Sequence, residues 1–198
     1  MFPSVCSRRI SLPRFGAAGR GPALALRSAA ILWLLALMAG CQTEVVIPEQ
    51  PTAQEQYDFA LQQFTEYSGL LMRSSQREEY ARRAETAFQM VIDRFPQEKH
   101  LVARSELFIG MIWKQRGKER KALGIMEDLL EKHPSDDDIQ IRALYEIGLL
   151  LDDLGKHRQA KDYYDKVVKR FGQSQKPEYR AIVTECRSRY QRVWSGGR

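Results

Sequence analysis

Residues 143–172 read ALYEIGLLLDDLGKHRQAKDYYDKVVKRFG, and this stretch fits an earlier copy of itself at residues 105–134. The small and apolar positions recur at that shift, which pairs Gly148 with Gly110, Gly155 with Gly117, Ala160 with Ala122, and Tyr164 with Met126. A second, equal shift extends the later half of the pattern to Ala84, Phe88 and Pro96. A fixed repeat period of 38 residues is typical of a stacked array, because one unit cannot bury its own apolar face.

These spacings resemble the tetratricopeptide repeat, a helix–turn–helix unit. The family's sequence of apolar, glycine, alanine and aromatic positions is matched by Leu144, Ile147, Gly148, Leu151, Ala160 and Tyr164. The resemblance implies an all-α fold, a short solenoid of about three helix hairpins with a C-terminal capping helix. It also implies a scaffold that binds other proteins.

Apolar residues at helical spacing predict hairpins over residues 53–96, 97–134 and 135–174. The first is degenerate, because Met72 stands where the later copies have glycine. Residues 175–198 predict a last helix, whose apolar stripe either covers the end of the array or docks on a partner.

Residues 1–40 have the composition of a signal peptide. They hold five arginines, no lysine and no acidic residue, and residues 29–40 form an apolar run that ends in small residues. As a helix, that run would rise about 18 Å, too short for a bilayer core of about 30 Å. A basic stretch, a short apolar run and a small-residue site predict export and removal of residues 1–40.

The end of this leader, residues 37–41 (LMAGC), resembles the lipobox of bacterial lipoproteins, which is cut before a cysteine that receives palmitate and other acyl chains. The alternative is an ordinary cleavage site with Cys41 present by chance. Under the lipoprotein interpretation, residues 41–52 form a lipidated tether. Gln42 after the cysteine then implies sorting to the outer membrane, on its periplasmic face. Loss of the leader leaves 26 basic against 25 acidic residues, which disfavours nucleic acid as a partner.

The leader and the cysteines each leave alternatives open. Residues 7–12 resemble a twin-arginine export signal, but a start codon assigned too early also explains the long leader. If Cys6 leaves with the leader and Cys41 carries lipid, Cys186 remains alone. It is either a small core residue or a reactive thiol.

Motifs for catalysis are missing from the sequence. There is no H-E-x-x-H, C-x-x-C or G-x-S-x-G, and the Gly-Lys pairs at 117–118 and 155–156 lack the earlier glycine of a phosphate loop. The histidines have no metal-ligand spacing. Residues 136–138 (DDD) favour a helix start over a calcium site. We therefore expect no enzyme, cofactor, metal or small-molecule substrate.

By resemblance to tetratricopeptide arrays, the first helices of successive hairpins line a concave groove for a protein partner of the cell envelope. The expected groove residues are Arg104, Leu107, Met111, Lys114, Gln115, Arg142, Tyr145, Leu149, Asp152 and Asp153. The alternative is a merely solvated helix face.

The repeat period, with long loops after residues 94–96 (RFP) and 133–134 (HP), also resembles the lipoprotein component of the β-barrel assembly machinery and the periplasmic tetratricopeptide protein that coordinates envelope constriction, over about residues 79–174. This resemblance implies a lipid-anchored scaffold, with outer-membrane protein assembly as the first hypothesis. A pilotin-like role in pilus or secretin assembly and a peptidoglycan-associated structural role are the alternatives.

Overall fold

A computed structural model describes residues 46–69 and 73–195, with side chains as far as Gln191, and residues 45–198 form one compact unit. The expected leader, Cys41 and Met72 lie outside the described residues. Helices make up most of the described part of the chain, which has no strand, and this confirms the all-α prediction. Its helices are α2 (Ala53–Tyr67), α3 (Ser74–Arg94), α4 (Lys99–Gln115), α5 (Glu119–Lys132), α6 (Asp137–Asp153), α7 (His157–Phe171) and α8 (Pro177–Ser195).

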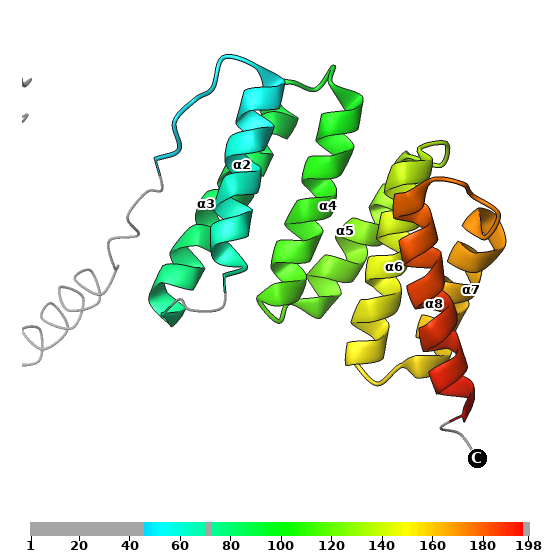
Figure 1. Ribbon diagram of the computed structural model, residues 1–198. Coiled ribbons are helices and arrows are strands. Elements are labelled where there is room, and N and C mark those ends of the chain that lie inside the picture. Colours follow the sequence, from blue (N-terminus) through cyan, green and yellow to red (C-terminus); the bar gives the residue numbers. More distant parts are fainter. Residues whose placement is uncertain (1–45, 70–72, 196–198) are drawn as a thin grey trace, which may run out of the picture. The chain divides into compact units, whose positions relative to one another are not determined.

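These helices form hairpins that stack side by side in two rows (Figure 1). Within the hairpins α2 packs on α3, α4 on α5, and α6 on α7. The first helices also contact one another in order, α2 with α4 and α4 with α6, and α8 continues that row by packing on α6 and α7. The first helices and α8 therefore share one side of the array.

Both later hairpins turn through the same glycine geometry. Gly117 and Gly155 have φ angles of 67° and 70°, a left-handed conformation that glycine adopts without a Cβ penalty. In each turn the following lysine N–H donates to a carbonyl of the preceding helix, Lys118 to Trp113 at 2.9 Å and Lys156 to Leu151 at 2.8 Å. This pattern closes the last helical turn as a Schellman motif.

The first hairpin departs from the regular spacing. Helices α4 and α6 begin at Lys99 and Asp137, exactly one repeat period apart, whereas α2 begins at Ala53, more than a full period before α4. An aromatic cluster packs α2 against α3 and α4. Tyr57 meets Phe88 edge to face at a centroid distance of 5.7 Å, and Phe88 stacks on Phe108 at 5.1 Å.

Helix α8 closes the far end of the array. Tyr179, Val183 and Cys186 are buried in the same core cluster as Tyr164 and Phe171 of α7. This packing matches the capping role expected for the C-terminal helix, because α7 would otherwise expose its apolar face. Among the described residues, no helix combines the length and the apolar composition needed to cross a bilayer.

Candidate partner-binding groove

A hollow of about 230 Å³ lies between the first helices of the second and third hairpins. Apolar side chains from α4, α6 and α8 form much of its lining, with two arginines and one glutamate among them. Its lining residues are Arg104, Leu107, Phe108, Met111, Arg142, Tyr145, Glu146 and Ile182. Small-molecule pockets usually enclose about 300–1,000 Å³, so this hollow better suits the side chains of a protein partner.

Five of the ten residues expected in the groove line this hollow together. Arg104, Leu107 and Met111 come from α4, and Arg142 and Tyr145 come from α6. Leu107 is buried, and the other four are half-buried. The repeat period relates Arg104 to Arg142 and Leu107 to Tyr145, so successive repeats present equivalent positions to the same space.

Lys114 was expected to face a partner, and the structure gives it a partner within the chain. Its Nζ lies 3.0 Å from Oε2 of Glu146 on α6, and both side chains are less than one-fifth exposed. This ion pair joins the two first helices at the edge of the hollow. Because Lys114 neutralises Glu146, the two arginines supply most of the charge that a partner would meet.

Asp152 was also expected in the groove, but its carboxylate is used inside the scaffold. It accepts a hydrogen bond from the Tyr164 hydroxyl at 2.8 Å, and His157 Nδ1 lies 3.0 Å from its other oxygen. Arg189 of α8 approaches at 3.8 Å. Asp152 therefore ties α6 to α7 and α8, and 15 % of its side chain is exposed.

The remaining expected residues lie apart from the hollow. Gln115 and Asp153 are exposed at the ends of α4 and α6, and Leu149 is half-buried. Gln115 borders a different hollow near the turns.

Sequence reasoning missed Phe108, Glu146 and Ile182. The repeat contained a signal for the first two, because Phe108 and Glu146 occupy equivalent positions of successive repeats and each follows an expected groove residue. Ile182 had no such signal. It reaches the hollow because α8 packs against α6.

The two arginines hold different positions at the hollow. The Arg104 guanidinium lies 5.2 Å from the centroid of the Tyr57 ring, an arrangement that restrains it by a cation–π contact. Arg142 contacts Asp138 through Nε at 3.3 Å, so its terminal nitrogens are not used by that pair. Burial raises the pKa of Tyr145, which stays a neutral hydrogen-bonding group at physiological pH. An apolar segment with a nearby carboxylate would complement this lining.

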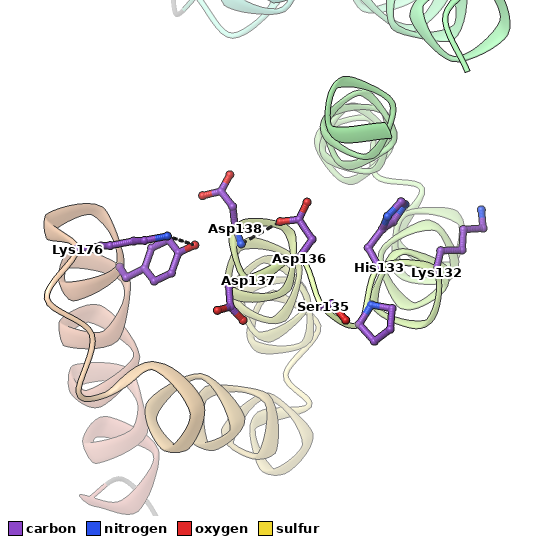
Figure 2. A pocket seen from close by; sticks show the side chains of 9 residues that line it. Lys132, His133, Ser135, Asp136, Asp137, Asp138 and Lys176 are labelled. Atoms are coloured by element: carbon purple, nitrogen blue, oxygen red, sulfur yellow. Dashed lines mark hydrogen bonds between the residues drawn. The ribbon is translucent and has the colours of Figure 1, made fainter. Parts of the chain in front are cut away.

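A larger hollow, about 590 Å³, lies at the α5–α6 loop but uses its polar groups internally (Figure 2). Asp136 accepts hydrogen bonds from the N–H groups of Asp138 and Ile139, which confirms the expected helix cap. Asp137 pairs with Arg170 at 2.9 Å. Figure 2 shows the three aspartates pointing in different directions. Within the described ranges, no group of three or more His, Cys, Asp or Glu side chains could hold a metal ion.

Comparison with known families matches one part of this array. A family model described as the tetratricopeptide repeat matches residues 142–174, the stretch that contains most of α6 and all of α7. A search of curated proteins finds no match. The chain thus contains a tetratricopeptide repeat within an all-α helical array, a class of fold that typically serves as a non-catalytic scaffold for protein–protein interaction.

Proposed function

We propose that the protein is a lipid-anchored scaffold of the bacterial envelope that uses the groove between α4, α6 and α8 to hold a protein partner during outer-membrane protein assembly. The observation that carries the binding role is the hollow itself, in which apolar side chains from three helices surround a small space beside Arg104 and Arg142. Such a surface fits an extended segment or an amphipathic helix that inserts one apolar anchor.

The chemistry of the lining favours a partner segment with an acidic residue next to its anchor. A carboxylate there would form charge-assisted hydrogen bonds with an arginine, which presents several donors in a fixed plane. Tyrosine and arginine are also the residue types most often found as binding hot spots. Tyr145 and Arg142 supply both types, one helical turn apart on α6.

The envelope location rests on sequence features at residues 1–42. A lipid at Cys41 and a short tether would hold the groove near the membrane, where newly exported proteins pass. Pilus or secretin assembly would use the same groove with a different partner, and a wall-associated role would not need it.

Affinity capture with matched variants tests the proposal. Purified protein is used to recover partners from detergent-solubilised envelopes, beside a variant with Arg142→Ala and Tyr145→Ala. The double variant should recover at least tenfold less of a specific partner, since truncating hot-spot residues costs about 2 kcal/mol or more. Circular dichroism and melting establish that the variant is folded.

Tyr190→Ala provides the control on α8. Tyr190 lies away from the hollow, with Lys161 Nζ 4.7 Å from its ring centroid. Its loss should leave partner recovery intact. Loss of the partner with folded Tyr190→Ala, and none with the groove pair, would place the partner on α8 and contradict the proposal. Identification of the partner as a barrel-assembly, pilus or wall protein separates the three roles.

A further inference from the structure

A second surface lies at the end of the array where the hairpins turn. The second helices α3, α5 and α7 all begin at this end, the lower one in Figure 1. Each follows a cationic N-cap residue, Arg73, Lys118 or Lys156, and none of these makes a side-chain capping hydrogen bond. We define the basic edge by these N-caps and by the arginines that follow them: Arg73, Arg77, Lys118, Arg120, Lys156 and Arg158.

The basic edge runs against the ordinary preferences of helix ends. Ser, Thr, Asp and Asn are favoured at N-caps, and acids are favoured in the first turn because the helix dipole is positive there. Neither α3 nor α7 has an acidic residue in its first turn, whereas α5 has Glu119 between Lys118 and Arg120. Helices α2, α4 and α6 begin at the opposite end, where α2 and α6 have side-chain caps from Thr52 and Asp136, whereas α4 has neither a side-chain cap nor an acid in its first turn. The cations at these N-termini are therefore unfavourable for the stability of α3, α5 and α7.

The cations of the basic edge are available to a partner. All six side chains belong to exposed residues, and no described carboxylate lies within ion-pair distance of them. The acids Glu78 and Glu85 are instead held by Arg116. Arg77 and Lys118 line one hollow of about 470 Å³ between the first two turns, so cations of neighbouring hairpins face the same space.

An exposed apolar residue lies at the same turn as one of these cations. Leu154, at the turn of the third hairpin, is 42 % exposed and lies close to Lys156 in the chain. Large apolar side chains are otherwise well covered in the described part of the chain, where Val46 of the tether is the other exposed example.

We propose that the basic edge docks on an anionic lipid bilayer, with its six cations at the headgroup phosphates and Leu154 in the interface. Basic residues near an anionic leaflet are attracted by its negative surface potential, and an apolar side chain adds binding by entering the headgroup region. A nucleic acid would use the cations but gives no reason to expose Leu154, and the vesicle experiment below separates a bilayer from an acidic protein. The inference depends neither on the groove nor on lipid at Cys41.

Vesicle binding by residues 45–198 tests the inference. This piece is a compact unit with its own core and lacks both the leader and Cys41. It should co-float with vesicles of phosphatidylglycerol and phosphatidylcholine and fail to co-float with phosphatidylcholine alone. Binding to the anionic vesicles should weaken as salt is raised, because salt screens exposed charges.

Two variants with equal net charge locate the binding surface. The edge variant changes Lys118, Arg120, Lys156 and Arg158 to Ala, and the control changes Lys99, Lys169, Lys176 and Arg180 to Ala. Each basic residue near an anionic surface contributes about a fivefold factor, so the edge variant should partition at least about a hundredfold less, and the control should stay within about threefold of the parent. Leu154→Ser should weaken binding severalfold and leave its salt dependence unchanged.

Three results would overturn the inference. They are a parent piece that does not bind anionic vesicles, an equal loss of binding in the edge and control variants, and edge-dependent binding of a polyanion such as single-stranded DNA without vesicle binding. Circular dichroism of each variant confirms that a loss of binding is not a loss of folding. A negative outcome here leaves the groove proposal untouched, because the groove variants are unchanged at the edge.

Discussion

The ring of Tyr164 on α7 lies directly against the backbone of Gly148 on α6. A Cβ placed on Gly148 would come 2.8 Å from Cδ1 of Tyr164, and closer still to Cε1. The preceding repeat shows the same relationship in a looser form, since a Cβ on Gly110 would lie 3.2 Å from Met126 Cγ. The glycine that recurs mid-helix is therefore explained by close helix contact.

Replacement of Gly148 by alanine should lower stability despite alanine's higher helix propensity. The Tyr164 ring would have to move, and overpacking of this kind costs about 1–3 kcal/mol. Movement would also disturb the hydrogen bond from Tyr164 to Asp152. Thermal or urea unfolding measures the change.

Gly124→Ala is the matched control, because a Cβ on Gly124 of α5 would meet nothing within 4 Å. Alanine there should stabilise the protein by about 0.5–1 kcal/mol through helix propensity. Equal effects of the two substitutions would show that Gly148 is not a packing position.

Ala160 is fully buried at the contact between α6 and α7, and Ala122 is its counterpart in the preceding hairpin. Ala160→Leu should cost about 1–3 kcal/mol through overpacking. The neighbouring Gln159 is exposed, and Gln159→Leu should change the unfolding free energy by less than about 0.5 kcal/mol. Similar melting temperatures for the two variants would refute close packing at Ala160.

Cys186 should resist thiol reagents in the folded protein. Burial raises the pKa of its thiol to about 12, and Glu185 adds to the shift, so almost no reactive thiolate exists near neutral pH. Maleimide labelling should be slow in buffer and fast in denaturant. Rapid labelling of the native protein would favour the reactive-thiol interpretation.

The same shift fixes the direction of a pH effect on stability. The folded state favours the neutral thiol, so the contribution of Cys186 is fully present below its unfolded pKa of about 9. It is lost as pH rises from there towards 12. Cys186→Ala should therefore reduce the fall in stability over that alkaline range.

The membrane anchor is tested by Cys41→Ala in the full chain. Under the lipoprotein hypothesis the variant accumulates as unprocessed precursor or releases soluble protein, because alanine has no sulfur to carry the lipid. Stable anchoring requires more than one acyl chain, so no other part of the anchor would replace it. Cell fractionation, gel mobility and labelling with a fatty-acid analogue provide the measurements. Identical mobility and soluble fractionation of the parent and the variant would disprove the anchor.

The sequence by itself determined the helical array, because its evidence is local and repeats. The repeat period is fixed along the chain. The turns require a left-handed backbone, which Gly117 and Gly155 adopt, and the neighbouring helices require small residues at Gly110 and Gly148. The groove residues were expected from the resemblance to tetratricopeptide arrays, and five of the ten line one hollow, where equivalent positions of stacked hairpins face the same side.

Tertiary structure alone decided which polar side chains remain for a partner. Lys114 and Asp152 have the right spacing for the groove, yet Glu146, Tyr164 and His157 engage them. Long side chains form ion pairs and hydrogen bonds with helices that are distant in sequence. Helical spacing predicts only the direction in which a side chain leaves its own helix. For the same reason Ile182 joins the groove, because the packing of α8 on α6, rather than any repeat of sequence, brings it there.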